Sequence, residues 1–180
     1  AKAVGMSEIQ LNAILGSLLG DGSLRMSGEL TKAIRWNHGI RQLDYVRHKY
    51  SLLSEFAVKE PYIIPNPGYG DYWAVLTLRS LGLFHCMYTL LRPEGSEKKT
   101  VTQAYLDQIT HPIALAWWFM DDGSRQKGEN VASIHSNGFS YEENELLASW
   151  LMDKWRIASH PLIVTHSSNS NTSTQLYIPP

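Results

Sequence analysis

The sequence is poor in cysteine and has no long apolar run. Its 180 residues include a single cysteine, which excludes an internal disulfide and a metal site built from paired cysteines. No apolar run approaches the roughly 20 residues of a membrane-spanning helix, and none has the flanks of a signal peptide. We therefore expect no membrane partner. Because Cys86 lies among apolar residues, we expect it to be a buried, structural thiol.

Several sequence signatures of enzymes are missing as well. The seven histidines include no pair at HxH or HExxH spacing, which disfavours a zinc enzyme. Neither GxGxxG nor GxxxxGKS/T occurs, so the chain lacks the usual loops that bind the phosphates of a nucleotide. These absences disfavour an enzyme driven by nucleotide hydrolysis.

Charge is nearly balanced over the whole chain but unevenly distributed. There are 16 basic and 17 acidic residues, with 12 basic and 9 acidic residues up to Lys99 and 4 and 8 from Thr100 onward. A short segment holds six of the basic residues: Arg25, Lys32, Arg35, Arg41, Arg47 and Lys49. Such a cluster is typical of a nucleic-acid surface, and equally of an ordinary solvated face. Charge alone leaves the partner open.

Hydrophobic periodicity and turn residues predict an α+β fold that repeats itself. Helical spacing predicts helices over 7–19, 42–58 and 81–93, and alternating or β-branched runs predict strands over 24–27, 32–38 and within 61–80. The order then recurs, with helices over 112–120 and 140–155 and strands over 131–136, 161–166 and 174–178. We expect duplicated αββαββα halves with antiparallel sheets, residues 1–97 and 98–180.

Two stretches, LGSLLGDGSL (15–24) and LAWWFMDDGS (115–124), each carry an apolar helix into an acid followed by Gly-Ser. If the two helices pack side by side in the same direction, Asp21 and Asp122 meet. Adjacent carboxylates repel each other unless a cation lies between them, and Mg²⁺ prefers such oxygen ligands beside phosphates. Acidic pairs with metals catalyse displacement at phosphorus. An Asp-Gly pair also commonly ends a helix. The spacing of the two motifs therefore fits either a metal site that acts on phosphate or two ordinary helix ends.

These two stretches resemble the signature motifs of the LAGLIDADG homing endonucleases, in particular the two-motif, intron-encoded branch whose second motif reads like YWFMDDG. Three further segments resemble the same branch: EKKTVTQAYLDQITHPIALAWWFMDDGS, FSYEENELLASWLMDKW and TQLYIPP. The resemblance covers nearly the whole chain and is strongest from Lys98 to Trp155. It implies a pseudo-two-fold fold in which the motif helices form the interface, with Trp117, Trp118 and Phe119 as packing residues.

The resemblance also implies an activity and its residues. It implies a Mg²⁺-dependent, site-specific endonuclease that cuts both strands of DNA and leaves short 3′ overhangs, with Mn²⁺ or Ca²⁺ able to replace Mg²⁺ in binding. Asp21 and Asp122 would bind the metal, assisted by the carbonyls of Gly20 and Asp121, and the Asp121 carboxylate would have a secondary role. Lys99 matches the family's catalytic lysine, with Lys98 as a rival one residue away.

DNA recognition in this family uses one antiparallel sheet per half, laid in the major groove. In the first half the candidates for DNA contact are Arg25, Lys32, Arg35, Asn37 and Arg79. In the second half they are Arg125, Lys127, Ser133, His135 and the loop SSNSNTST. Which of them contact bases and which contact phosphates stays open.

Two departures from the family pattern keep other functions open. The sequence reaches Pro179-Pro180 without the closing helix and tail that the family usually adds, so a second catalytic basic residue is not identified. The net charge is also low for a DNA-binding protein. An intron RNA maturase, a non-cleaving nucleic-acid-binding protein and a purely structural α+β protein therefore remain alternatives. The expected protein is a monomer acting on a long duplex site, in a mitochondrial, plastid or bacterial compartment.

Overall fold

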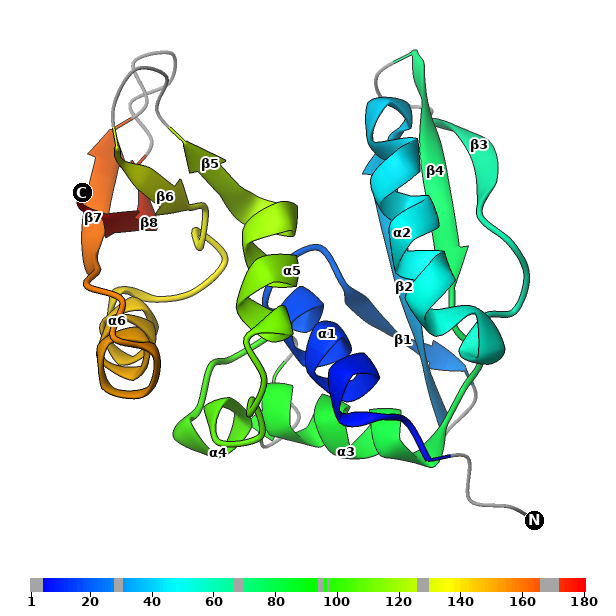
Figure 1. Ribbon diagram of the computed structural model, residues 1–180, viewed down its shortest axis with the longest axis horizontal. Coiled ribbons are helices and arrows are strands. Elements are labelled where there is room, and N and C mark those ends of the chain that lie inside the picture. The colour runs from blue at the N-terminus through cyan, green and yellow to red at the C-terminus, as the bar shows by residue number, and fades with distance from the viewer. Residues whose placement is uncertain are drawn as a thin grey trace.

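The computed structural model describes residues 5–27, 31–66, 70–93, 96, 98–125, 130–165 and 172–180, without the side chains of residues 26, 27, 31 and 32. Two α+β halves flank a central pair of helices (Figure 1). Across these ranges, no helix has both the length and the apolar character needed to cross a membrane.

Both halves contain a helix, two strands, a second helix and two further strands in that order, which confirms the predicted duplicated α+β fold, and α3 then follows in the first half. The first half contains α1 (Glu8–Leu19), β1 (Ser23–Ser27), β2 (Thr31–Gly39), η1 (Ile40–Gln42), α2 (Leu43–Leu53), η2 (Ser54–Phe56), β3 (Tyr62–Asn66), β4 (Asp71–Thr77) and α3 (Gly82–Leu91). The second contains α5 (Ile113–Asp122), preceded by α4 (Gln103–Leu106), then β5 (Gly123–Arg125), β6 (Ala132–Ile134), α6 (Tyr141–Trp155), β7 (His160–Thr165) and β8 (Thr172–Ile178).

The two sheets have the same topology. Their strand orders are β1-β2-β4-β3 and β5-β6-β8-β7, with every pair antiparallel. Ser23 pairs with Arg35 in the first hairpin and Ser124 pairs with Ser133 in the second, so the second hairpin is three residues shorter. Arg35 and Ser133 are therefore equivalent, 98 positions apart. Helices α2 and α6 begin at Leu43 and Tyr141, also 98 positions apart, so the same offset relates the residues of β2 and α2 to those of the second half.

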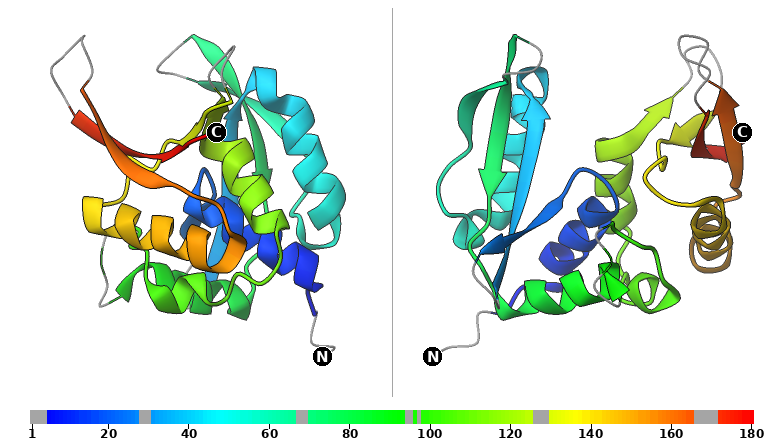
Figure 2. Two further views of the ribbon diagram at one scale, coloured as in Figure 1. Left: turned by 60° about the vertical axis from the view of Figure 1, so that its left-hand side comes forward. Right: turned by 180° about the vertical axis from the view of Figure 1, so that it is seen from behind.

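Helices α1 and α5 are in backbone contact at the centre of the molecule, and they remain side by side when it is seen from behind (Figures 1 and 2). A Cβ atom on Gly16 would lie 1.9 Å from the carbonyl oxygen of Ala114. Farther along, a Cβ on Gly20 would lie 2.7 Å from the Cβ of Asp121. The helices thus run in the same direction, and their C-terminal ends meet.

Buried polar bonds hold this helix pair in register. The side-chain oxygen of Asn12 accepts hydrogen bonds from the backbone N–H groups of Thr110 (2.7 Å) and His111 (2.9 Å), just before α5 begins. The Tyr105 hydroxyl of α4 donates to the carbonyl of Leu15 at 2.7 Å. Asn12 is 1% exposed and Tyr105 is fully buried, so both bonds are shielded from competing water.

The apolar core joins both halves through the motif helices. Trp117 and Trp118 are buried and Phe119 packs against the core, as expected from the resemblance. The expectation for Cys86 is wrong, because its side chain is exposed. Helix α3 turns Phe84, Met87 and Leu91 toward the core, and Cys86 falls on the other side of that stripe.

Replacing Gly16 by alanine tests the helix contact. The added methyl group would overlap the Ala114 carbonyl, so we expect the free energy of unfolding to fall by about 1–3 kcal/mol, as for other overpacked cores. Urea unfolding measures the change. Gly82→Ala is the matched control, because a Cβ at Gly82 would meet nothing within 4 Å. Equal stabilities of the two variants would contradict the close contact.

Candidate metal and nucleic-acid site

Asp21 and Asp122 lie at the meeting ends of the two motif helices. The N–H groups of Gly20 and Gly22 both donate to the carbonyl of Ser17, at 3.1 and 2.8 Å, and this turn ends α1 around Asp21. A Cβ on Gly20 would lie 3.1 Å from Oδ2 of Asp122, so the second acid sits directly against the end of the first helix. Asp21 and Asp122 come close together because the chain turns at Asp21 and because Gly20 has no side chain to keep Asp122 away.

The electrostatics of these two acids suit a cation. Burial, and then the charge of Asp121, raise the pKa of Asp21 above its usual value. Burial, and then the charge of Asp21, raise the pKa of Asp122 to about 7. The Asp21 side chain is nevertheless 40% exposed, so it is reachable from solvent. Mutually repelling, partly buried carboxylates with one accessible edge form a donor set that fits Mg²⁺ or another hard divalent cation.

Lys99, which belongs to the second half, forms hydrogen bonds with the end of the first motif. Its ammonium group donates to the carbonyls of Gly20 (2.8 Å) and Gly22 (2.7 Å), the two residues that flank Asp21. Burial lowers the pKa of Lys99 to about 8, while the charges of Asp122 and Asp21 oppose that shift. The structure thus brings three of the predicted site residues, Gly20, Asp21 and Lys99, into one contact group beside Asp122.

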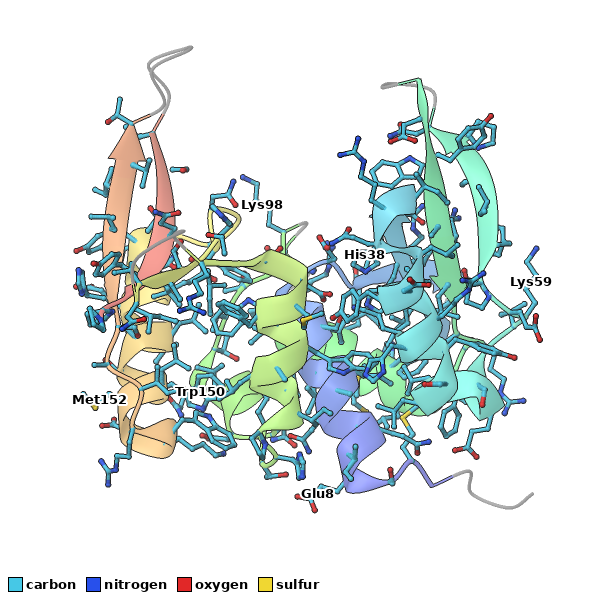
Figure 3. The ribbon with its side chains drawn as sticks, turned by 45° about the horizontal axis from the view of Figure 1, so that its top comes forward. Glu8, His38, Lys59, Lys98, Trp150 and Met152 are labelled. Carbon is cyan, nitrogen blue, oxygen red and sulfur yellow. The ribbon has the colours of Figure 1, made fainter. Side chains whose placement is uncertain are left out.

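A cavity of about 440 Å³ opens beside Asp122 and Lys99. Lys98 and His135 also line it, and Figure 3 shows Lys98 near the end of α5. The backbone N–H of His135 donates to the Asp122 carbonyl at 2.9 Å. His135, predicted as a DNA contact, therefore lies next to Asp122.

The Asp121 side chain is held by the first half of the molecule. It is fully buried, and its Oδ1 accepts from the Lys49 ammonium at 2.6 Å and from the Tyr45 hydroxyl at 2.9 Å. Its Oδ2 accepts from the Ser17 hydroxyl. Ser17 in turn accepts from Lys49 at 2.8 Å and from the Trp36 indole at 2.7 Å. This network, the Asp121 cluster, occupies both carboxylate oxygens.

Lys49 was missed as a site residue from sequence. It is fully buried, and burial lowers its pKa while Asp121 opposes the shift. The available signal was its place on the apolar stripe of α2, three residues after Val46 and four before Leu53, both buried. A lysine at such a position needs a buried acid as its partner.

His38 is a second residue that lies closer to the site than expected. Its buried ring has Nδ1 3.4 Å from Asp21 Oδ2 and Nε2 3.9 Å from Asp121 Oδ1. Burial, and then the charge of Lys49, lower the pKa of His38 to about 4. Among the residues that the structure describes, Asp21, His38 and Asp121 form a group whose ligand atoms lie within 4.8 Å of one another.

The first sheet places three predicted DNA contacts on one face. Arg25 on β1 and Arg35 and Asn37 on β2 lie on the face opposite to the buried Ile34, Trp36 and His38. The Nε–H of Arg35 donates to Asn37 Oδ1 at 2.9 Å, which orients the pair. The guanidinium of Arg79 instead donates to the carbonyl of Glu55 at η2, away from this group. The Lys32 side chain lies outside the described residues.

The second sheet offers mainly hydroxyl groups. The hydroxyls of Ser124 and Ser133 lie 3.0 Å apart, and they line a hollow of about 340 Å³ together with Arg125, Gln175 and Tyr177. Lys127 and residues 167–171 of the loop SSNSNTST lie outside the description, and the rest of that loop belongs to β8.

Replacing Lys49 by methionine tests the Asp121 cluster. The change leaves a buried carboxylate without its cation, so we expect the free energy of unfolding to fall by about 3–5 kcal/mol. The double variant Lys49→Leu/Asp121→Ala removes both charges and should recover much of that loss. Denaturant unfolding of the three proteins measures both effects. A loss below about 1 kcal/mol in the single variant would contradict a buried ion pair.

Comparisons with known proteins agree with this geometry. The model of the LAGLIDADG DNA endonuclease family matches residues 11–176. The Protein RecA of Mycolicibacterium flavescens is 34% identical over 140 residues, which is 74% of this chain and 31% of that protein. The Cytochrome b mRNA maturase bI2 of Saccharomyces cerevisiae is 27% identical over 179 residues, 93% of this chain and 41% of that protein. The chain thus spans less than half the length of these relatives.

Solved structures share the fold. The homing endonuclease I-WcaI bound to its DNA recognition sequence has a TM-score of 0.80 at 19% identity, covering 98% of this chain and 77% of that one. I-DmoI in complex with DNA and Mn has a TM-score of 0.50 at 14% identity, covering 96% and 90%. With the family model matching most of its length, this chain belongs to the LAGLIDADG DNA endonuclease family.

Proposed function

We propose that the chain is a site-specific endonuclease that cleaves both strands of a long DNA site and leaves short 3′ overhangs. The observation that carries the proposal is the backbone contact of α1 and α5, which joins Asp21 and Asp122 into one acidic site. A polar sheet face lies on either side of that site. Family membership adds support.

Asp21 and Asp122 bind divalent metal, Mg²⁺ in the cell, with Mn²⁺ or Ca²⁺ able to replace it in binding. The carbonyls of Gly20 and Asp121 assist, while the Asp121 carboxylate stays in its cluster with Lys49. A bound divalent cation supplies Lewis-acid stabilisation of the charge that develops on a scissile phosphate. The similarity to I-DmoI, whose complex with DNA contains Mn, supports a divalent metal as the cofactor.

Lys99 provides positive charge at the same place. Its ammonium group lies at the turn around Asp21. Burial lowers the pKa of Lys99, and the negative charge of Asp122 is the largest effect that raises it again. From there it stabilises negative charge on the phosphate and holds the Asp21 turn. Lys98, in the adjoining cavity, contacts DNA backbone.

The two sheets contact the two halves of the DNA site. Arg25, Arg35 and Asn37 face one half-site. Lys32 and Arg79 remain weaker candidates for DNA contact in the first half, Arg79 from its separate position at η2. Arg125, Ser133 and His135 face the other half-site. Lys127 and the loop SSNSNTST stay candidates on the sequence alone. One chain supplies both halves, residues 1–97 and 98–180, so the protein acts as a monomer.

Intron RNA binding without cleavage is the second candidate function. The observation that favours it is the likeness to a yeast mRNA maturase, which extends over 93% of this chain. A maturase retaining this fold would bind RNA and would not depend on Asp21 and Asp122 as a metal pair.

A cleavage selection tests the proposed function. The purified chain is incubated with a randomised duplex library and Mg²⁺, and the cut ends are sequenced. We expect enriched sites with short 3′ overhangs. Asp21→Asn and Asp122→Asn should each reduce cleavage to background while leaving the Kd for the recovered site nearly unchanged, because each removes a metal ligand and little of the DNA surface. Retained cleavage in both variants, or no enrichment alongside tight intron RNA binding, would overturn the proposal.

Replacing Lys99 by methionine tests its electrostatic role. We expect the single-turnover cleavage rate to fall by about 10²–10³-fold, the usual effect of losing one stabilising donor. Lys98→Met is the matched control, since this neighbouring lysine makes no contact with the Asp21 turn among the described contacts. We expect it to raise the Kd for DNA and change the rate little. The opposite ranking would assign the catalytic role to Lys98.

A further inference from the structure

The imidazole of His38 faces two oxygen atoms with the same ring nitrogen. Its Nδ1 lies 3.4 Å from Oδ2 of Asp21 and 3.3 Å from Oε1 of Gln42. The ring is fully buried, whereas Asp21 and Gln42 are exposed. Three atoms with lone pairs thus converge from the end of α1, from β2 and from η1, at the solvent edge of the site.

The surroundings of the other ring nitrogen, Nε2, determine which tautomer of His38 is favourable. Nε2 is buried without a hydrogen-bond partner, and Oδ1 of Asp121 lies 3.9 Å away. With hydrogen on Nδ1, the Nε2 lone pair would face that carboxylate, which is unfavourable. With hydrogen on Nε2, the N–H points toward the carboxylate, and the Nδ1 lone pair then faces two oxygens. The second arrangement leaves the Nδ1 lone pair to be satisfied either by a cation or by the NH2 group of a rotated Gln42 amide.

The separations match those of a coordination shell. Two ligand atoms about 2.1 Å from one cation, at an angle of 90–110°, are about 3.0–3.4 Å apart. Both observed separations fall in this range, and both exceed the roughly 2.9–3.0 Å of the usual N–H···O bond.

We propose that Asp21, His38 and Gln42 together bind one first-row transition-metal ion, of the class of Mn²⁺, Co²⁺ and Zn²⁺, through two oxygens and one imidazole nitrogen. This deepens the proposed function and rests on it for the role of Asp21. It assigns the position at Asp21 to an ion other than Mg²⁺ and leaves Mg²⁺ at Asp122. An imidazole ligand favours such ions over Mg²⁺ and Ca²⁺, which prefer oxygen donors alone. The Asp121 carboxylate, occupied by Lys49 and Tyr45, is not a ligand and orients the ring from its far side.

The second half has no equivalent of this ligand set. The residue equivalent to His38 is Ser136, whose hydroxyl donates to Asn144, and the residue equivalent to Gln42 is Ser140, the N-cap of α6. The residues equivalent to His38 and Gln42 thus offer hydroxyl oxygens in place of an imidazole and an amide, and the two halves of the site differ in chemistry.

A Co²⁺ titration of the whole chain without DNA tests the proposal. Visible absorption reports Co²⁺ binding, and competition gives the Mg²⁺ affinity. We expect Co²⁺ to bind more tightly than Mg²⁺. His38→Ala should weaken Co²⁺ binding by about 10–100-fold with little effect on Mg²⁺, and Gln42→Ala should weaken it by about tenfold. His85→Ala, which removes an exposed histidine of α3, is the matched control and should change neither affinity.

Equal losses of Co²⁺ and Mg²⁺ affinity in His38→Ala, or no loss of either, would overturn the proposal. Should that variant fail to fold, Gln42→Ala carries the test, together with pulsed EPR of the Mn²⁺-loaded wild type. Nitrogen coupling to the bound Mn²⁺ supports imidazole ligation, and its absence contradicts it. Because DNA is absent, failure here leaves cleavage untouched, and failure of the cleavage selection leaves the titration result unchanged.

Discussion

The contact between α1 and α5 is the constraint on which the rest of the structure depends. Two glycines allow it: a side chain on Gly16 would enter the Ala114 backbone, and a side chain on Gly20 would enter Asp121. Because the helices are parallel and this close, their ends deliver Asp21 and Asp122 to one place, and the two sheets diverge from there (Figures 1 and 2). Moving the helices apart by the thickness of one methyl group would increase the distance between Asp21 and Asp122. It would also increase the distance between the two sheets.

Within this pseudo-symmetric frame, the two halves differ where charge is buried. Gly20 in the first motif is equivalent to Asp121 in the second, and Lys49 of α2 is equivalent to Leu147 of α6. The positions equivalent to the Lys49–Asp121 ion pair are therefore occupied by two uncharged residues, Leu147 and Gly20. A buried ion pair stabilises little compared with apolar packing, but removing one partner is costly. The pair thus makes the arrangement of the two halves specific and ties the second motif to the first half.

Sequence patterns predicted the framework better than the buried polar groups. The helical spacing of apolar residues over 7–19 identified α1, and the second motif identified α5, because both are local signals. The Asp121 cluster was not predictable in this way, since Lys49 and Asp121 are 72 residues apart and a lysine is normally solvent-exposed. His38 was not selected as a site residue, because a lone histidine in a sequence is more often an ordinary structural residue than a ligand. Cys86 was misassigned because its neighbours are apolar while its own position on α3 faces outward.

The central claim is that the two motif ends form one metal site. Iron-directed cleavage of the protein tests it without knowledge of the DNA target: Fe²⁺ replaces the native ion, ascorbate and peroxide generate radicals at the bound metal, and mass spectrometry maps the cut peptide bonds. The account predicts cuts at both helix ends, around Asp21 and around Asp122, suppressed by excess Mg²⁺. Cuts at only one of the two ends, or cuts scattered along the chain, would contradict it.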